Sequence, residues 1–400
     1  MALSETPEFP GYDVVIVGGA IIGSSVAWWT KRNPDFTGRI LVVERDPTYE
    51  FASTSHTNSC IRQQFGTEIN IKISQFAVEF IKGFRTFMDD PEVPEIGLHS
   101  TGYLYLADNQ SAADILISNQ QLQASLGVAT RVLTPDQIAA DYPFYNLDGI
   151  ILATHNPVNE GYFDGGTMFD CFRKSAGSKG VEYIRNEVIG ITNTADKVTA
   201  IKLASGETVS ADCLVNAAGP RAAIIAAMAG LDLPVEPRRR YSFIFDTPEH
   251  LSADLPLTID PSGVHFRSDG RYYLAGCPPD DDVAVEFDDF AMDHAIWEEK
   301  IWPAIANRIP AFERAKVINY WVGHYAYNTL DQNAVVGPHP GVKNFIFANG
   351  FSGHGLQQSP AMGRGVSELI IYGGYQNLDL TPLGYERIVE NKPLLESAII

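Results

Sequence analysis

The feature that most constrains this chain is a glycine-rich turn between a short apolar run and an apolar helical segment. The run 13–17 is typical of a buried parallel strand, and GGAIIG follows it directly at 18–23. Residues 22–31 then predict a helix that Asn33-Pro34 ends, and residues 39–44 predict a second strand. Together these elements predict one βαβ unit of roughly 30 residues, the size of a dinucleotide-binding half.

Each position of this unit has a physical role in holding a pyrophosphate at a helix N-terminus. Gly18 permits the tight turn, Gly23 lets the helix pack closely on the strand, and Ala20 adds only a methyl group where glycine is usual. Glu44 ends the second strand, where a carboxylate can bind ribose hydroxyls and disfavours a 2′-phosphate. A chance glycine cluster is the alternative. The unit alone does not separate FAD from NAD.

Composition excludes several classes of protein. The chain has 400 residues, 45% of them apolar, and 29 basic against 49 acidic residues give a net charge of −20. This balance argues against binding to nucleic acid or to an anionic membrane. The four cysteines form no CxxC pair, and no apolar run reaches the roughly 18 residues of a membrane span. With neither a basic nor an apolar leader at its start, the sequence predicts a cytoplasmic protein without a membrane span.

Further glycine-rich turns follow apolar runs near the middle and the end of the chain, at 216–220 and 350–355. Their scatter predicts an α/β fold in which a Rossmann-like nucleotide-binding domain is assembled from discontinuous segments. We assign 1–87, 151–230 and 322–400 to this domain. Residues 88–150 and 231–321 then form an α+β substrate domain with a mixed or antiparallel sheet. The other elements expected are a helix over 73–87, a helix capped by Thr134, strands at 101–107, 181–184, 188–191, 198–203 and 208–210, a β-rich stretch over 241–277, a helix-like acidic stretch after it and a last strand at 345–348.

Four motifs carry a resemblance to a known family. They are VVIVGGAIIG at 14–23, LVVERD at 41–46, VNAAGP at 215–220 and FANGFSGHGLQQSP at 347–360. With them the chain resembles the FAD-dependent amino acid and amine oxidoreductases, which include D-amino-acid oxidase, glycine oxidase and sarcosine oxidase. The resemblance spans nearly the whole chain. It implies that the cofactor is FAD and that the Rossmann-like domain binds it.

The resemblance also implies which residues contact FAD. Val188 would meet the adenine through its backbone, and Gly219 would line the phosphate–ribitol path. Backbone N–H groups at 353–355 would face the pyrimidine edge of the flavin, where they stabilise the negative charge of the reduced ring. The full predicted set is Gly18, Gly19, Ala20, Ile21, Ile22, Gly23, Glu44, Arg45, Ser53, Thr54, Ser55, His56, Val188, Ala218, Gly219, Gly350, Ser352, Gly353, His354, Gly355 and Leu356.

His56 has two interpretations. The segment Ser53-Thr54-Ser55-His56 resembles the Ser-Thr-x-His of dimethylglycine and sarcosine dehydrogenases, whose histidine is bonded covalently to the flavin. The alternative is a loop histidine that lies near the cofactor without a bond to it. His324 stands where sarcosine oxidases carry their flavin-linking cysteine, so a cysteinyl link is excluded there. It is instead a second possible anchor or a polar wall of the pocket.

Arg62 is the best candidate for binding a substrate carboxylate, because sarcosine oxidases place an arginine in this loop and a guanidinium grips a carboxylate through two hydrogen bonds. A surface or phosphate-side arginine is the alternative. Gln357 replaces the lysine that the family pairs with this arginine. The family's oxygen-activating lysine would fall near Tyr272, yet no lysine occurs between Lys202 and Lys300. The further pocket candidates are His324, Tyr272, Tyr241 and Tyr325.

The resemblance predicts an enzyme that oxidises the C–N bond of an amino acid or a secondary (N-methyl) amine. A hydride passes to flavin N5, and the imine formed is hydrolysed. The electron acceptor is oxygen or unknown. A second hypothesis is an FAD-binding assembly or partner-docking factor with little turnover, because segments such as VERDPTYEFAST (43–54) resemble a mitochondrial complex I assembly protein of this family. An NAD-dependent dehydrogenase is a third hypothesis, which requires a colourless protein.

Two charged clusters remain outside these assignments. Residues 280–299 hold nine acidic residues and no lysine or arginine, and three arginines stand together at 238–240. The simplest interpretation of each is a solvated face or strand start. Alternatively, the acidic run steers a cationic amine or docks a basic partner, and one of the three arginines faces the site.

Overall fold

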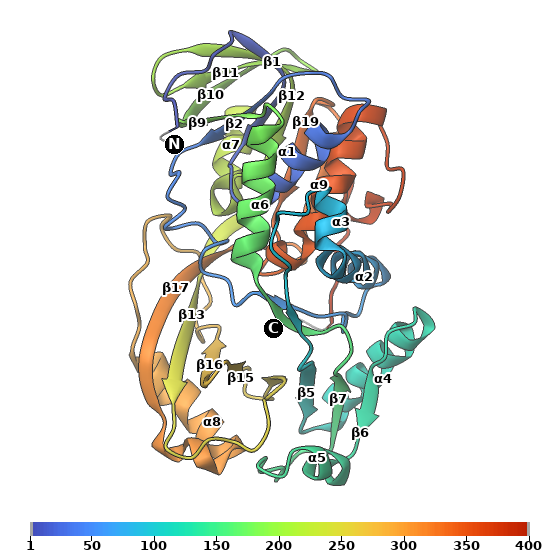
Figure 1. The fold of residues 1–400 in the computed structure, drawn as a ribbon, viewed down its shortest axis with the longest axis vertical. Helices are drawn as coiled ribbons and strands as arrows, with labels where there is room; N and C mark the ends of the chain where they lie inside the picture. Colours follow the sequence, from blue (N-terminus) through green and yellow to red (C-terminus); the bar gives the residue numbers. More distant parts are fainter. Residues whose placement is uncertain (1–2, 398–400) are drawn as a thin grey trace.

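Two eight-stranded sheets organise the chain, of which the computed structural model describes residues 3–397 (Figure 1). The first sheet has the order β10-β11-β12-β1-β2-β9, with β19 beside β12 and β18 beside β19. Its strands are β1 (Gly11–Val17), β2 (Ile40–Glu44), β9 (Glu182–Arg185), β10 (Val188–Asn193), β11 (Val198–Leu203), β12 (Thr208–Asn216), β18 (Val335–Pro338) and β19 (Phe345–Asn349). Strands β1, β2, β9, β12 and β19 pair in parallel.

The second sheet lies in the lower part of Figure 1 and has the order β17-β13-β16-β15-β14-β5-β7-β6. Its strands are β5 (Tyr103–Ala107), β6 (Arg131–Leu133), β7 (Leu152–Asn156), β13 (Val235–Asp246), β14 (Leu257–Ile259), β15 (His265–Asp269), β16 (Tyr272–Cys277) and β17 (Lys316–Asn328). Only β5 and β14 pair in parallel, so this sheet is mixed. A small third sheet joins β3 (Cys60–Ile61), β8 (Gly161–Phe163) and β4 (Leu98–His99).

The helices cover both lobes. They are α1 (Ile21–Arg32), α2 (Glu68–Lys82), α3 (Phe84–Met88), α4 (Gln110–Ser125), α5 (Pro135–Asp141), α6 (Gly165–Ser178), α7 (Ala222–Met228), α8 (Trp302–Arg308), α9 (Gly355–Tyr372) and α10 (Glu386–Val389). A 3₁₀ turn, η1 (Gly219–Arg221), precedes α7, and a π-helical turn, η2 (Trp297–Ile301), precedes α8. None of the helices within residues 3–397 is long and apolar enough to cross a lipid bilayer.

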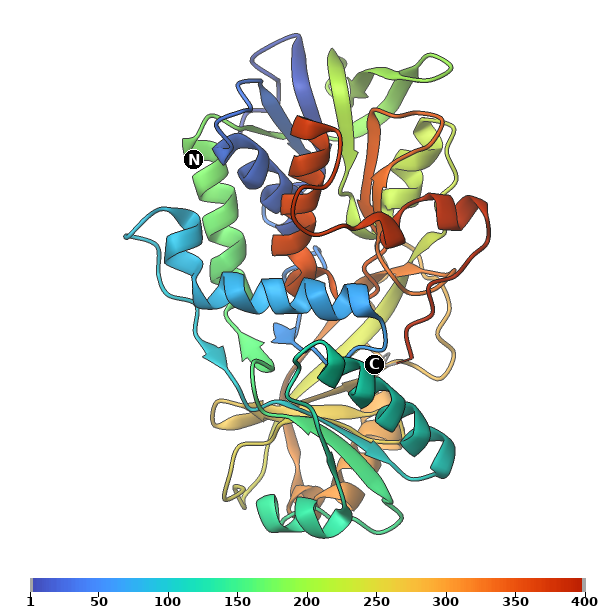
Figure 2. The ribbon, with the colours of Figure 1, turned by 90° about the vertical axis from the view of Figure 1, so that its right-hand side faces the viewer.

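The predicted βαβ unit is confirmed, with β1 and β2 in parallel on either side of α1. Every residue of β2 is buried, which agrees with a strand covered on both faces. Figure 2 shows α9 alongside α1, although some 330 residues separate them, with α6 on the other side of α1. Trp28 of α1 is completely buried and packs against Phe172 of α6 and Phe80 of α2. The first lobe is therefore assembled from distant segments, as the spacing of the glycine-rich turns predicts.

The structure modifies several expected boundaries. The helix expected over 73–87 begins at Glu68 and breaks at Gly83. Strand β7 pairs with β5 in the second sheet, although our boundary at residue 151 groups it with the first lobe. The boundary at residue 322 falls inside β17. Thr134 caps α5 as expected, in a capping box with Gln137.

The acidic stretch after β16 is not the helix that the sequence suggests. Residues 278–294 form neither helix nor strand, and the helical segment starts only at the end of the acidic run. Acidic residues placed close together repel one another along a helix, whereas an extended segment lets each find a separate partner.

The contact between α1 and α9 gives a test of the packing. A Cβ on Gly363 of α9 would lie 2.1 Å from Oγ of Ser25, a hydroxyl that donates to the carbonyl of Ser359. We expect Gly363→Ala to lower the free energy of unfolding by about 1–3 kcal/mol, because the helices must separate. The midpoint of urea unfolding measures this change. Gly177→Ala in α6 is the control, since a Cβ there meets nothing within 4 Å and should leave stability unchanged or slightly raised. Equal effects of the two variants would contradict the packing argument.

Candidate functional site

An elongated cavity of about 390 Å³ runs from the carboxyl edge of the first sheet to the second sheet. The strands β1, β2, β12 and β19 all end at it, and the turns that follow them line it. Of the predicted cofactor residues, those that line the cavity are Gly18, Ala20, Ile21, Ile22, Glu44, Arg45, Ser53, Thr54, His56, Val188, Ala218, Gly219, Ser352, Gly353, His354, Gly355 and Leu356. The predicted residues that do not line the cavity are Gly19, Ser55 and Gly350, which belong to the same turns, and Gly23, which lies in the first turn of α1.

The first turn brings the N-terminus of α1 close to the sheet. Gly18 has a φ of +99°, and a Cβ there would lie 2.4 Å from the carbonyl oxygen of Ala217. A Cβ on Gly23 would lie 1.9 Å from the carbonyl oxygen of Gly18. Ala20 precedes α1 without a side chain that can cap it, and the Ile21 N–H donates to Thr54 Oγ1 at 3.3 Å. The start of the helix therefore offers further N–H groups to an anion in the cavity.

Glu44 lies at the end of β2 and faces this turn. Its Oε2 accepts the N–H of Gly19 at 2.8 Å, and its Oε1 accepts the N–H of Asp46 at 2.8 Å. Burial raises the pKa of Glu44 above its usual value, while these two N–H groups oppose the shift. Each oxygen keeps a lone pair, so the side chain can also accept hydrogen bonds from ribose hydroxyls.

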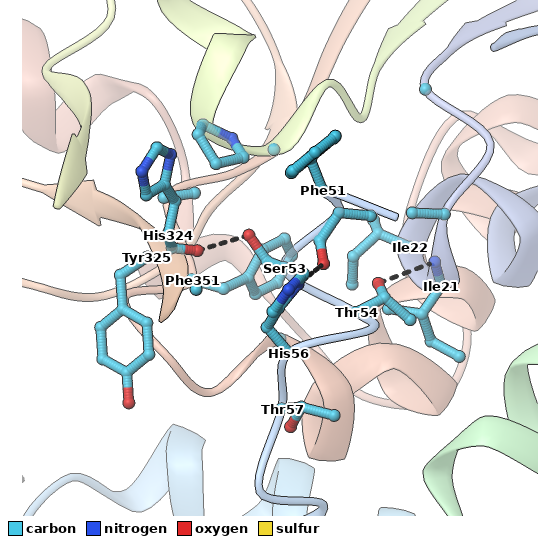
Figure 3. Close-up of a pocket in the computed structure, with 18 of the residues that line it drawn as sticks. Ile21, Ile22, Phe51, Ser53, Thr54, His56, Thr57, His324, Tyr325 and Phe351 are labelled. Carbon is cyan, nitrogen blue, oxygen red and sulfur yellow. Dashed lines mark hydrogen bonds between the residues drawn. The ribbon is translucent and has the colours of Figure 1, made fainter. Parts of the chain in front are cut away.

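The loop 51–57 forms a second wall and is tied to β17 (Figure 3). Ser53 Oγ donates to the carbonyl of His324 at 2.5 Å, and His56 Nδ1–H donates to the carbonyl of Ala52 at 3.2 Å. On the opposite side, Gly353 has a φ of +98°, and a Cβ there would lie 2.4 Å from the ring of Tyr325. His354 then starts α9 without a side-chain cap. Free N–H groups of this 18-residue helix are therefore available at the cavity.

Arg62 lies at the end of the cavity that adjoins the second sheet, and it is only 1% exposed. Nη1 donates to the carbonyl of Gln64 at 2.7 Å and to the hydroxyl of Tyr105 at 2.6 Å. Nη2 donates to Nε2 of His354 at 2.9 Å, and the guanidinium lies 3.9 Å from the ring centre of Phe65. The Nε–H and the second N–H of Nη2 have no partner among residues 3–397. These two donors are the part of the cation that can still bind an anion.

The segment that carries Arg62 is fixed from two sides. Oε1 of Gln357, in α9, accepts the backbone N–H of Arg62 at 2.9 Å. The buried carboxylate of Glu160 accepts the N–H groups of Gln63 and Gln64 at 2.7 and 2.9 Å. Burial raises the pKa of Glu160 to about 7, and the hydrogen bonds and Arg62 oppose this shift. The guanidinium is thus held in one orientation relative to α9.

His354 is neutral at ordinary pH. Burial and the neighbouring Arg62 lower the pKa of its imidazole to about 3. Since Nε2 accepts a hydrogen from Arg62, the ring proton is on Nδ1. His354 is therefore an uncharged partner of Arg62, and it leaves the positive charge of the guanidinium available to a ligand.

The structure brings most of the predicted pocket residues together. Gln357, Tyr241, Tyr325 and Arg240 line the cavity, and so does His324, whose Nε2–H donates to the carbonyl of Asp289 at 2.7 Å. Burial lowers the pKa of His324. Tyr272 lies outside the cavity, because it starts β16 at the hairpin opposite Asp269, whereas the other end of this strand, at Cys277, reaches the cavity.

Sequence reasoning missed several residues at the end of the cavity that holds Arg62. Asn58, Cys60, Tyr103, Leu257, His265 and Cys277 also line the cavity. His265 is half-buried as a residue, its buried Nδ1 has no hydrogen-bond partner among the described residues, and removal of the ring from water lowers its pKa to about 4. Most of them come from strands whose pattern indicates burial alone, so no motif marks them. No three His, Cys, Asp or Glu side chains within residues 3–397 are grouped as a metal site.

Comparison with known proteins decides the family. Residues 13–369 match the family described as "FAD dependent oxidoreductase". The chain belongs to this family of FAD-dependent oxidoreductases. It is 39% identical over 423 residues to FAD-dependent oxidoreductase domain-containing protein 1 of Xenopus laevis, covering 97% of this chain and 85% of that protein. It is 24% identical to human mitochondrial sarcosine dehydrogenase, covering 90% of this chain and 40% of that protein.

The fold of this FAD-dependent oxidoreductase is also that of solved structures. The crystal structure of L-proline dehydrogenase from P. horikoshii superposes with a TM-score of 0.83 at 24% identity, covering 98% of this chain and all of that one.

FAD is the cofactor of the family, and the residues present fit it. The uncapped starts of α1 and α9 face the cavity, and side chains are absent at Gly18 and Gly353, where the backbone makes close approaches.

The close contact at Gly23 predicts a specific loss of cofactor. We expect Gly23→Ala to lower the affinity for FAD at least about tenfold, because the new methyl group would push α1 away from the turn at Gly18. The ratio of flavin absorbance near 450 nm to protein absorbance, measured after dialysis, reports the loss. Ala20→Gly is the matched control in the same turn and should keep its flavin. Full retention of FAD by Gly23→Ala would show that this contact is not required.

Proposed function

We propose that this flavoprotein oxidises the C–N bond of an amino acid or of a secondary (N-methyl) amine. The observation that carries the proposal is the buried Arg62, a fixed cation at the end of the cofactor cavity with two unused donors. A buried cation of this kind favours a ligand that carries a carboxylate. The names of the amino acid and amine dehydrogenases among the related proteins agree with this substrate class.

The chain's own residues bind and orient the substrate. The carboxylate lies on the free edge of Arg62, while Gln357 and Glu160 keep this arginine in place. Tyr103, Leu257 and Tyr325 provide a largely apolar wall that excludes water and favours the neutral form of the amine. This orientation directs the C–H bond next to nitrogen into the part of the cavity between the loop 51–57 and the start of α9.

When FAD is bound, it supplies the acceptor for the two electrons that this oxidation releases. The substrate carbon loses its hydrogen as a hydride, and the nitrogen lone pair completes the C=N bond of an iminium. The iminium nitrogen then releases its N–H proton to water, which gives the imine. Water then hydrolyses the imine to an amine and a carbonyl compound. The final electron acceptor is oxygen or an unidentified carrier. No side chain need remove a proton from carbon.

One observation favours the alternative, an FAD-binding assembly or partner-docking factor with little turnover. Three of the five N–H groups of Arg62 already have protein partners, and the place of the family's pairing lysine is taken by the uncharged Gln357. The carboxylate therefore meets a smaller positive charge than a pair of cations would provide. Anaerobic bleaching of the flavin by any amino acid or amine would exclude this alternative.

The role of Arg62 is tested by substitution. We expect Arg62→Gln to slow anaerobic flavin reduction by an active amino acid about 100-fold, because the carboxylate loses its charged partner. Stopped-flow absorbance near 450 nm measures this rate. Reduction by an amine without a carboxylate should change far less.

Arg271→Gln is the control for Arg62→Gln, since Arg271 is exposed and lies outside the cavity. It should reduce at the wild-type rate with every substrate. Equal rates for Arg62→Gln and the wild type with all carboxylate substrates would contradict the role of Arg62.

We expect the FAD to be bound without a covalent link. His324 donates its Nε2–H to a carbonyl and stacks on Phe290, which hold its ring against the wall. His56 donates its Nδ1–H to the carbonyl of Ala52, so Nε2 is the nitrogen through which a link would have to form. Acid precipitation of the yellow protein should therefore leave the flavin in the supernatant. Colour in the pellet would contradict this expectation, and loss of that colour in His56→Ala or His324→Ala would identify the anchor.

A further inference from the structure

The acidic segment between β16 and α8 forms part of the cofactor cavity. From 278 to 294 it runs without helix or strand, and in Figure 1 it forms the long loop at the left edge of the molecule. Phe287, Asp288 and Phe290 of this segment line the cavity. The carboxylates of an acidic segment free in solution would repel one another and keep the segment extended. A specific attraction must therefore hold this segment against the protein.

Arginines from two elements provide that attraction. Asp282 accepts two hydrogen bonds from Arg240, at 2.7 and 2.8 Å, and lies 3.4 Å from Nη1 of Arg238. Asp289 pairs with Arg239 at 3.3 Å. The pair of Asp288 with Arg221 of η1 is shorter, at 2.7 Å, but its carboxylate is 87% exposed and therefore screened. The pair of Asp282 with Arg240 is bidentate, and its side chains are 23% and 14% exposed, so it is the strongest of the set.

An aromatic contact anchors the same segment over the cavity. The ring of Phe290 is stacked on His324 at 4.0 Å between centroids and at an angle of 10°. It also lies 4.9 Å from the ring of Phe51, in the loop that carries His56. Figure 3 shows Phe51, His56 and His324 around this end of the cavity. Phe290 therefore adds a third link between two walls of the cavity that are also joined by the hydrogen bonds from Ser53 to His324 and from Trp321 to His56.

We propose that residues 280–293 form a strap that closes the cofactor cavity, and that Arg238, Arg239 and Arg240 are positioning residues that hold it there. The ion pairs also neutralise carboxylates that would otherwise repel the negatively charged pyrophosphate of FAD. FAD can leave only after the strap detaches, so its release rate depends on the pairs. Partly exposed ion pairs weaken in salt, so release accelerates as ionic strength rises.

Two variants with the same change of charge test the strap in the holoprotein. We expect Asp282→Asn to raise the rate of FAD release on the order of tenfold, because the bidentate pair with Arg240 is lost. Asp281→Asn removes a neighbouring exposed carboxylate that forms no ion pair with any residue of 3–397, and it should release FAD at the wild-type rate. The increase of flavin fluorescence after dilution measures the rate. Salt should accelerate release from the wild type more than from Asp282→Asn.

A protease that cleaves after acidic residues gives a second readout, which does not depend on how the flavin is attached. Asp282→Asn should be cut within 280–293 faster than Asp281→Asn. Phe290→Ala should also speed both cleavage and flavin release, while it keeps the salt dependence of the wild type. If Asp282→Asn and Asp281→Asn agree in release rate and cleavage, the proposal is wrong. Neither readout requires turnover of an amine, so the result stands apart from the proposed function.

Discussion

The structure depends on the parallel pairing of β1, β2, β12 and β19. Carboxyl ends of parallel strands meet at one edge of a sheet, so turns from three distant stretches of the chain come together there. The approach of α1 to this edge is possible only because Gly18 and Gly23 have no side chains. The loop 51–57 follows β2 and the start of α9 follows β19, so the positions of both depend on where these strands end.

The arginines at the two ends of the cavity differ in the charge of their partners. At the substrate end a single guanidinium is held by uncharged partners, the imidazole of His354 and the hydroxyl of Tyr105, so its charge is left for a ligand. At the strap, arginines and aspartates neutralise one another. A chain with a net charge of −20 thus keeps a buried guanidinium at this end of the cavity, where an anionic group can bind.

Local patterns predicted the fold and the cofactor turns, because a βαβ unit and its glycines are specified within about 30 residues. The environment of Arg62 could not be predicted in the same way, since Tyr105, Glu160 and His354 reach it from separate elements. The simplest interpretation of the acidic run and of the arginine triplet is a solvated face or strand start, with a docking or steering role and one site-facing arginine as the alternatives. The two clusters are instead partners across some 40 to 50 residues of sequence, a relation that composition alone does not show. Tyr272 is a pocket candidate because the family's oxygen-activating lysine would fall near it, yet β16 reaches the cavity only at its other end.

The long strands β13 and β17 pair along their whole length, and each contributes to two hydrophobic cores. Val235 and Ala326 pack in the core beneath the first sheet, whereas Phe243 and Val322 pack in the core of the second lobe. Bending the lobes about a hinge would break ladder hydrogen bonds and open both cores at once. The width of the cavity between the two sheets is therefore set by the backbone. On such a scaffold the size of the ligand that fits depends on the side chains that line the cavity more than on movement of the lobes.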